Sequence, residues 1–472
     1  MKIAAFIVAL VCCGLMFYVK REWKAALLVM GAMTLTVVEI PVIPLHRANF
    51  LLQVAFVLSE WKHWPQHFRE LRRMPYLCTL ILLVSVSALL ALLTSSYVDP
   101  KFFIESELLF KYYALAYAFW AIKDEKSLKP VLQVSLYCLI VLTFFGVLNY
   151  IEKNAMFVNA LTEGTTSKIY EDVALGDVYT ESARFRVQSM FKSAFDYGYT
   201  CAAILILHLH GYHRHLESKR AFVIALVCCS FGILMCGCRI VWVGAIFSIA
   251  CYSMWVFQLS RNVMYGMIAV MLLIIAYNTV PAVEDKVNKV TDVFVENSET
   301  EGSSIQMRLS QYAYVLIYTE GNEWLGLGTG YWVHIYSEDQ RSVEGLLGVE
   351  SVILSYLLER GIIGLILWIA FYTIIFRYFW KNRKCRGKPS ASSLALTGMG
   401  ASVLTLYLVF SIGTGELGSV YPTMLLLGMA MKMIESNKRK TMLYALLRRI
   451  IKSKNLTRRQ QLGLIMRAIR KT

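Results

Sequence analysis

Long apolar stretches recur from one end of this chain to the other, and they restrict its fold more than any other feature. A helix needs about 20 apolar residues to cross a bilayer core of about 30 Å. Since lipid offers the backbone no hydrogen-bond partner, only helices and closed barrels cross it. The alternating segments that are typical of a barrel, each of about ten residues, are absent. The sequence therefore predicts an all-α polytopic integral membrane protein.

The apolar stretches predict about 12–13 transmembrane helices. The composition agrees, because 57% of the 472 residues are hydrophobic and only 17% are charged, whereas a soluble domain has about 25% charged residues. The third candidate span is the shortest. The candidate spans are residues 2–19, 25–44, 47–60, 76–96, 104–122, 130–151, 194–212, 220–238, 240–258, 262–280, 355–379, 392–412 and 417–434.

Lys and Arg are concentrated in every second connection between these spans. Basic connections face the cytoplasm in helical membrane proteins. The pattern therefore predicts an N-terminus outside and a C-terminus in the cytoplasm. The basic connections are residues 20–24, 62–73, 123–129, 213–220, 261 and 377–388.

The spans and connections divide the chain into six parts. The predicted parts are N-terminal transmembrane helices (1–151), a first outer loop (152–193), central transmembrane helices (194–280), a large outer loop (281–354), C-terminal transmembrane helices (355–434) and a basic amphipathic cytoplasmic tail (435–472). From Lys438 onwards the tail contains basic and apolar residues but no acidic one. Such a tail favours contact with anionic inner-leaflet lipid over binding to nucleic acid.

Two clusters of metal-ligand residue types occur, and neither predicts a metal site. Cys236 and Cys238 lie two residues apart on a predicted helix, so they face different ways. The run "HLHGYHRH" at 208–215 lies at the predicted cytoplasmic end of span 194–212, where we expect a solvated interfacial cap. No cysteine falls in a long outer loop, so no disulfide framework is expected.

The large outer loop contains a predicted helix and a glycine-rich turn. Apolar residues at helical spacing, Ile305, Leu309, Tyr312 and Leu316, predict an amphipathic helix whose N-cap is Ser303 or Ser304. The following "GLGTG" at 326–330 lacks the strand–turn–helix context of a nucleotide-binding loop. We expect it to turn the backbone sharply near the membrane surface.

Four arginines are predicted on the outer face, at membrane-surface level: Arg184, Arg186, Arg239 and Arg308. An arginine in or beside a membrane segment usually marks a functional site or a paired charge. Several guanidinium groups on one face suit an anion with spread charge, such as a diphosphate. The alternative for each arginine is a snorkelling or salt-bridged side chain.

The order of several motifs carries a family resemblance. "RVQSMFKSAFDYGY" leads into a span, "CRIVWVG" follows, and the outer loop contains "MRLSQYAYVLIYTEGNEWLGLGTGYW". The loop runs into "ESVILSYLLERGIIGL", and "GELGSVYPTMLLLGM" closes the pattern. This order, over residues from roughly 180 to 430, resembles the O-antigen ligase and polymerase superfamily of bacterial surface polysaccharide assembly.

The resemblance implies a GT-C-like glycosyltransferase in the bacterial inner membrane, with its active site facing the periplasm. It implies a glycan donor on undecaprenyl diphosphate, no cofactor and no metal. Arg186, Arg239 and Arg308 match the arginines that hold the diphosphate, and Arg184 is a less secure match. A chain-length regulator is a further candidate partner.

The start of the span after the outer loop departs from the ligase pattern. Ligases of this family have a histidine where this chain has Glu350, which favours a polymerase over a ligase. Glu350 could act as a general base or pair with an arginine. We interpret Glu359 and Arg360 as structural, and the glycines after them as a site of close helix packing.

Weaker candidates for contacts with sugar are Asp196, Tyr331, Trp332 and His334. Aromatic residues stack on sugar rings, but an interfacial aromatic belt explains them equally well. A rival class is a transporter of polysaccharide or lipid-linked glycan. It would be expected to have two similar halves, and no such repeat is found.

Overall fold

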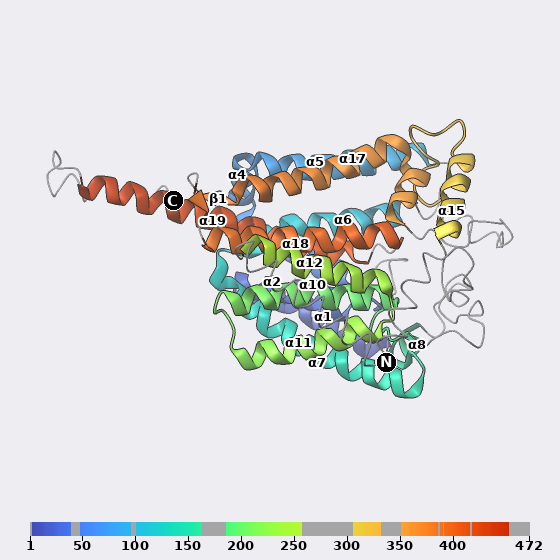
Figure 1. The fold of residues 1–472 in the computed structure, drawn as a ribbon, viewed down its shortest axis with the longest axis horizontal. Coiled ribbons are helices and arrows are strands. Elements are labelled where there is room, and N and C mark those ends of the chain that lie inside the picture. Colours follow the sequence, from blue (N-terminus) through green and yellow to red (C-terminus); the bar gives the residue numbers. More distant parts are fainter. Residues whose placement is uncertain are drawn as a thin grey trace, which may run out of the picture.

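The computed structural model of the chain describes residues 2–38, 48–95, 101–162, 186–256, 305–331, 351–385, 388–389, 391–415 and 418–452. Within these ranges long helices run side by side, roughly along one axis (Figure 1). Every predicted span except 262–280 overlaps with a helix, although the helix in span 25–44 already ends at Thr34, and span 262–280 lies outside the described residues. The prediction of an all-α polytopic membrane protein is confirmed.

The N-terminal third forms the first group of helices. They are α1 (Lys2–Tyr18), α2 (Arg21–Thr34), α3 (Ala48–Ser59), η1 (Trp61–His63), α4 (Trp64–Arg73), α5 (Pro75–Thr94), α6 (Lys101–Ala121), η2 (Glu125–Ser127), α7 (Leu128–Glu152) and α8 (Met156–Thr162).

The rest of the chain adds α10 (Ala194–His213), α11 (Lys219–Met235), α12 (Arg239–Val256), α15 (Ile305–Tyr318), α17 (Val352–Asn382), α18 (Ala391–Gly413) and α19 (Val420–Lys452). Two short strands, β1 (Lys384–Cys385) and β2 (Lys388–Pro389), pair antiparallel between α17 and α18.

Five of the described helical segments are long and apolar enough to cross a membrane by length and composition. The apolar helices α1 and α3 are shorter. The five segments are Pro75–Thr94, Glu125–Glu152, Arg239–Val256, Val352–Asn382 and Ala391–Gly413.

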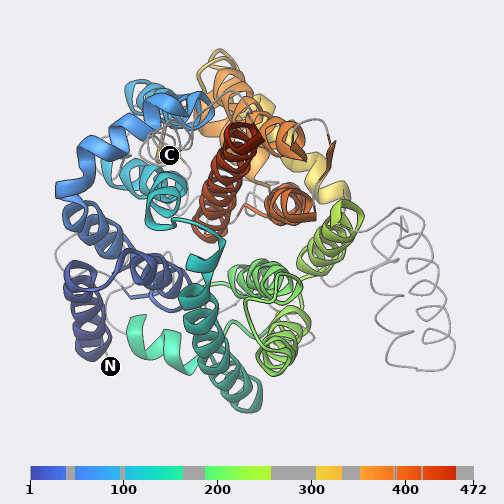
Figure 2. The same ribbon diagram turned by 90° about the vertical axis from the view of Figure 1, so that its left-hand side faces the viewer.

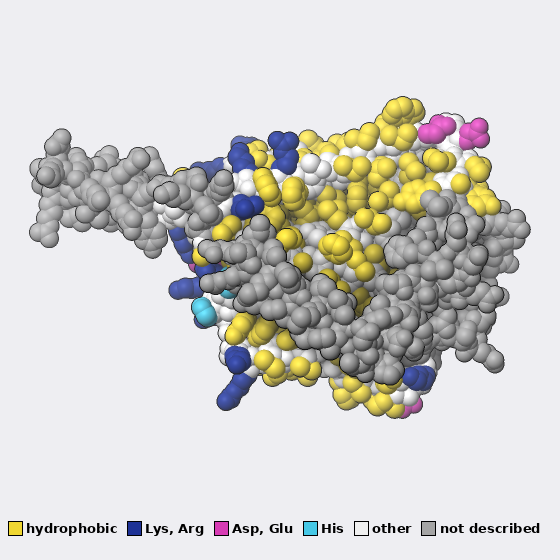
Figure 3. Space-filling view, in the orientation of Figure 1, with side chains coloured by type: hydrophobic (Ala, Val, Ile, Leu, Met, Phe, Trp, Pro, Cys, Tyr) yellow, Lys and Arg dark blue, Asp and Glu magenta, His cyan; other side chains and the backbone are white. Residues whose placement is uncertain are grey.

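The two ends of the bundle differ in their charge. Lys and Arg side chains gather at the end from which α19 projects, whereas hydrophobic side chains cover much of the visible flank (Figure 3). This end is named the basic end. It contains the connections at 19–20, 60–74, 122–127, 214–218, 383–385 and 388–389. The opposite end is named the loop end, and it contains α15 and residues 186–193, 236–238, 319–331, 414–415 and 418–419.

The core lies where α10, α18 and the first half of α19 pack together. Both α10 and α18 are buried along most of their length, and α19 lies near the middle of the bundle in Figure 2. Small residues allow this close packing. A side chain at Gly428 would collide with the backbone carbonyl of Leu115 on α6.

Beyond the basic end, α19 continues without a break to Lys452 and projects along the bundle axis (Figure 1). Its side chains hold it to the neighbouring connections. Lys440 bonds to Asp124 at 2.9 Å, and Lys432 bonds to Glu70 at 2.8 Å. Contact between the tail and anionic lipid stays a prediction, and residues 453–472 lie outside the described part of the chain.

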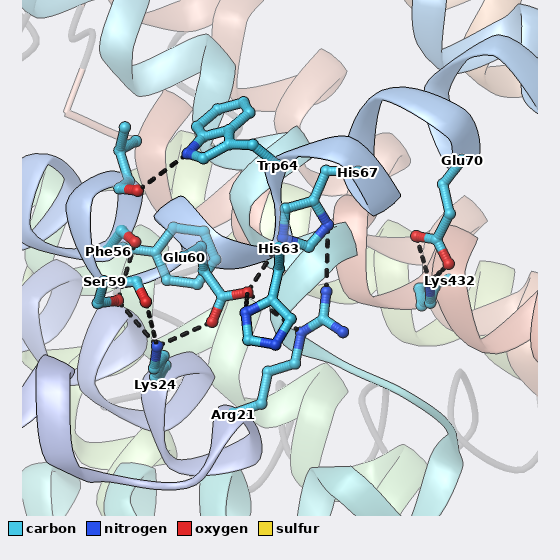
Figure 4. Close-up of polar contacts among 11 residues, drawn as sticks. Arg21, Lys24, Phe56, Ser59, Glu60, His63, Trp64, His67, Glu70 and Lys432 are labelled. Carbon is cyan, nitrogen blue, oxygen red and sulfur yellow. Dashed lines mark hydrogen bonds and ion pairs between the residues drawn. The ribbon is translucent and has the colours of Figure 1, made fainter.

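A buried charge cluster joins the N-terminal helices at the basic end (Figure 4). Glu60, which is 2% exposed, accepts hydrogen bonds from Lys24 at 2.8 Å and from His67 Nε2 at 3.0 Å. Arg21 lies 3.3 Å from His67 Nδ1. Since arginine can only donate, Nδ1 of His67 is the acceptor in this contact. The ring of His67 also stacks on Trp120, with centroids 4.9 Å apart.

The cluster holds Glu60 in its charged form. Burial alone would raise the pKa of Glu60, but hydrogen bonds from His67 and Lys24 and nearby positive charge lower it to about 2. Removing one partner of such a pair would leave a buried charge without compensation. The cluster therefore fixes how the first helices pack.

The expectation of a solvated histidine cap is wrong for His208 and His210, because both are fully buried. They lie on α10, which other helices surround. His208 bonds to Glu217 at 2.8 Å and to Ser135 at 3.1 Å, and His210 lies 3.6 Å from Glu125. These histidines therefore contribute to packing between helices.

Candidate functional site

The segment that contains Arg186 lies against the turn between α11 and α12. The backbone N–H of Val187 donates to Met235 O at 3.1 Å. Gly237 has a φ of +66°, and a Cβ on it would lie 3.4 Å from Arg186 Cγ. The guanidinium of Arg186 lies over the ring of Phe195, 5.6 Å from its centroid. Arg186 therefore lies beside the turn at residues 236–238, which leads directly into Arg239.

Arg239 is the first residue of α12, at the loop end, and it is partly buried. The N-terminus of a helix carries a partial positive charge, which adds to the charge of the arginine. The next residue, Ile240, packs against Gly413 at the end of α18, where an added Cβ would lie 2.7 Å from the isoleucine side chain. The structure thus brings Arg186 and Arg239, predicted from separate motifs, to adjoining segments.

Asp196 lies in the first turn of α10, close to the same segments. The helix is capped by Ser193, whose hydroxyl accepts from Phe195 N at 3.1 Å. A carboxylate in a first turn is favoured by the helix dipole. A side chain on Gly418, just before α19, would collide with the Asp196 carboxylate. The glycine therefore lets the start of α19 approach this acid.

The start of α17 docks on the end of α18. Ser351 caps α17, is 3% exposed and donates to Ser411 O at 3.2 Å. The N–H of Val352 donates to Thr414 O at 3.0 Å. Residues 411–414 thus contact both the residue after Arg239 and the residue after Glu350. Glu350 itself lies outside the described residues.

The predicted outer-loop helix is α15, and it contains Arg308 in its N-terminal half. It packs on the first part of α17 through Val315, which forms a buried cluster with Leu354 and Leu358. Tyr331 packs against the same cluster. The side chain of Arg308 lies outside the described part, as do Arg184, Trp332 and His334.

The apolar face predicted for α15 is partly wrong. Tyr312 and Leu316 are 36% and 58% exposed, while Gln311 and Val315 are fully buried. At a membrane surface an exposed apolar side chain can face lipid, so hydrophobicity alone does not identify the packed face.

The glycine-rich turn inserts into a break in α17. Gly361 has a φ of +61°, which interrupts the helix. A Cβ on Gly326 would lie 2.5 Å from Gly361 N, so both positions require glycine. Four backbone hydrogen bonds join the two segments: Leu327 N to Leu358 O, Gly328 N to Glu359 O, Ile362 N to Glu323 O and Ile363 N to Trp324 O, at 2.8–3.1 Å. Gly361, directly after Arg360, does allow close packing, as predicted, but its partner is the loop backbone.

A buried ion pair secures this insertion. Arg360 bonds to both oxygens of Glu105 on α6, at 2.6 and 2.7 Å, and to Ser87 on α5 at 3.1 Å. Thr329 of the glycine-rich turn donates to Glu105 at 2.9 Å, and its carbonyl accepts from Ser95 at 2.7 Å. The cleft beside the pair, of about 20 Å³, has room for only a water or two and is too small for a sugar. The predicted structural role of Arg360 agrees with these contacts.

Sequence reasoning missed Glu105 as the partner of Arg360. The two residues are 255 positions apart, and Glu105 lies near the start of a long apolar stretch. The available signal was an acidic residue within a predicted span, which calls for a basic partner.

Residues 224–369 match the model of a protein family described as O-antigen ligase. The matched part runs from α11 to the middle of α17 and includes Arg239, Arg308, the glycine-rich turn and Glu350. The resemblance to the O-antigen ligase and polymerase superfamily is confirmed. A search of curated proteins finds no significant match.

The family match supports an enzyme of the glycosyltransferase type that acts on lipid-linked glycan. Arg186 and Asp196 precede the matched residues. The structure nevertheless places Arg186 against the α11–α12 turn, inside the matched part. The candidate site thus combines segments from within and outside the family match.

Proposed function

We propose that the chain is a membrane glycosyltransferase that polymerises undecaprenyl-diphosphate-linked oligosaccharide repeat units. The product is a surface polysaccharide, such as an O-antigen, a capsule or an exopolysaccharide. The observation that supports the proposal is that the segments of Arg186 and Arg239 adjoin at the loop end, where the end of α18 contacts both Ile240 and the start of α17. Arg239 and the start of α17 lie within the residues that match the O-antigen ligase family, whereas Arg186 and the end of α18 lie outside them.

The proposed reaction is a displacement at the anomeric carbon of the donor glycan. An acceptor hydroxyl forms the new glycosidic bond, and the bond from that carbon to the diphosphate oxygen breaks. The electron pair stays on the diphosphate, and the hydroxyl proton passes to a base. Arg186, Arg239 and Arg308, with Arg184 as a less secure member, would stabilise the charge that develops on the diphosphate. The scheme needs no metal and no cofactor.

Two roles remain for Glu350. As a general base it would accept the proton of the acceptor hydroxyl. As a partner of an arginine it would hold the site together without transferring a proton. Asp196, Tyr331, Trp332 and His334 are the proposed contacts for the sugar.

The proposed orientation places the loop end outside the inner membrane and the basic end in the cytoplasm. Lys and Arg gather at the basic end (Figure 3), as expected of a cytoplasmic face. The N-terminus of the chain lies at the loop end, and α19 projects from the basic end (Figure 1). A donor on the outer leaflet would then meet the arginines.

An O-antigen ligase, which transfers the glycan to the lipid A core, is the second candidate. The description of the matched family favours it. Glu350, in place of the histidine that ligases of the family have, favours the polymerase.

The surface polysaccharide of a deletion strain tests the proposal. A polymerase predicts loss of long chains while single repeats stay attached to the core. Loss of all attached chains would instead identify a ligase, and an unchanged profile would contradict both. Reporter fusions at residues 165 and 320 should report the outer face, and fusions at 215, 384 and 455 the cytoplasm. A cytoplasmic residue 320 would contradict the mechanism.

A further inference from the structure

A groove lies at the basic end, between the first turn of α5 and the last turns of α17. It has a volume of about 540 Å³ and is lined by Tyr76, Phe376, Arg377, Trp380 and Lys381. Pockets of roughly 300–1,000 Å³ hold small molecules in proteins. Phe376 and Trp380 are 45% and 56% exposed, and they stack on each other with centroids 5.9 Å apart. Aromatic side chains of this kind are typical of the membrane–water interface.

The groove carries positive charge without a matching acid. Arg377 and Lys381 are exposed, and no ion pair involves either one among the described residues. The nearby acids are engaged elsewhere: Glu70 of α4 binds Lys432, and Glu435 of α19 binds Lys438 and the Tyr378 hydroxyl. Other basic residues of this end do pair with acids of the protein: Lys24 pairs with Glu60, and Arg214 pairs with Glu125. The positive charge of the groove is therefore available to an anion that is not part of the protein.

The groove continues into an apolar stripe on α17. Ile366 and Ile369 are 55% and 51% exposed and share a helix face with Phe376 and Trp380. Arg377 lies 26 residues after Ser351, which is roughly 40 Å along a helix. A bilayer core is about 30 Å thick. The cations of the groove and the candidate site thus lie at opposite membrane surfaces.

We propose that this groove binds an anionic phospholipid. The phosphate of the headgroup lies between Arg377 and Lys381, the headgroup rests on Tyr76 and Trp380, and one acyl chain follows the stripe of Phe376, Ile369 and Ile366. Basic pockets between helices on the cytoplasmic side bind anionic lipid headgroups in this way. The site is separate from the proposed donor site, so it does not depend on the proposed function.

Native mass spectrometry of the full-length protein tests the proposal. The protein is exchanged into micelles that contain equal amounts of phosphatidylglycerol and phosphatidylcholine, and the retained lipid is counted. The wild type should retain phosphatidylglycerol in preference. Removing both charges with Arg377→Gln and Lys381→Gln should lower this retention by about 10- to 30-fold.

Two matched variants serve as controls. Lys219→Gln with Arg220→Gln removes the same charge from exposed positions of the basic end, away from the groove, and should retain lipid like the wild type. Arg377→Lys with Lys381→Arg keeps the charge and should retain the preference. Equal retention by the Gln pair, or equal retention of both lipids by the wild type, would overturn the proposal.

A photo-reactive benzophenone residue in place of Trp380 identifies the occupant in cell membranes. Adducts whose mass equals that of an anionic phospholipid support the proposal. Adducts with a protein would show that a membrane protein occupies the groove, and would contradict the proposal of a lipid site.

Discussion

Two buried charge clusters stand at opposite ends of the molecule, and they join different kinds of segments. At the basic end, Glu60 binds Lys24 and His67 from neighbouring helices of the N-terminal part. At the loop end, Glu105 binds Arg360 from 255 residues away and also holds Thr329 of the glycine-rich turn. Only Arg360 and Thr329 lie within the residues that match the O-antigen ligase family.

The difference shows how a membrane protein can fix both its packing and its loop. The Glu60 cluster joins helices that are near one another in sequence, so its role is local packing. The Arg360 pair joins the transmembrane bundle to the loop that leads into α17 and contains α15. Disrupting the first should therefore affect stability, and disrupting the second should also release the loop.

The largest effect is expected from the arginines of the loop end. Arg239→Ala and Arg308→Ala should each abolish polymer while the protein stays inserted, because both are proposed to hold the diphosphate. Replacement by Lys should rescue only part of the activity, since a point charge lacks the bidentate fork. Arg220→Ala at the basic end is the control and should leave polymer normal. Polymer of normal length from both alanine variants would contradict the proposal that Arg239 and Arg308 hold the diphosphate at the loop end.

Glu350 tests whether proton transfer belongs to the loop end. If it is a general base, Glu350→Gln should lower the rate by about 100- to 10,000-fold. If it pairs with an arginine, the same change should weaken donor binding or stability by about 1–3 kcal/mol and leave substantial turnover. Activity in Glu350→His at neutral pH, with none in the Gln variant, would support the base. Near-normal polymer from the Gln variant would exclude it.

Disrupting the Arg360–Glu105 pair should free the glycine-rich turn from the bundle, which disrupting the Glu60 cluster should not do. Glu105→Gln leaves the buried guanidinium of Arg360 without its counter-charge and should lower the free energy of unfolding by about 3–5 kcal/mol. Limited proteolysis should then cleave the exposed turn near Glu320 to Trp324 faster than in the wild type. Combining Glu105→Gln with Arg360→Met should cost less than the sum of the single changes. An unchanged cleavage rate in Glu105→Gln would contradict a role of the pair in holding the loop.

The smallest effect, and one confined to stability, is expected at Glu60. Its pKa is lowered from 4.5 to about 2, so its contribution to stability is present above pH 4.5 and is lost as the pH falls through about 2. Glu60→Gln should lower the thermal unfolding midpoint at pH 7, and the difference from the wild type should shrink at pH 3. Faster cleavage of the 319–331 turn in this variant would show that the two clusters are coupled after all.

Several features could be predicted from the sequence because they depend on local composition. Each apolar stretch has the length of a span, so the positions of α5, α7 and α12 follow from hydropathy alone. Lys and Arg in alternate connections predict a basic end, which Figure 3 shows. The cost of placing arginine near lipid identifies Arg186 and Arg239 as candidate site residues from the sequence alone.

Only the tertiary structure decided which of these segments meet. Gly361 reads as one glycine in an apolar helix, and its positive φ depends on the loop backbone that inserts there. His208 reads as part of a solvated run, yet α10 lies among other helices and buries it. Arg360 finds its carboxylate 255 residues away. Hydropathy and charge along a chain report the environment of a segment, whereas the partner of a buried polar group depends on which helices pack together, and that packing is a property of the whole bundle.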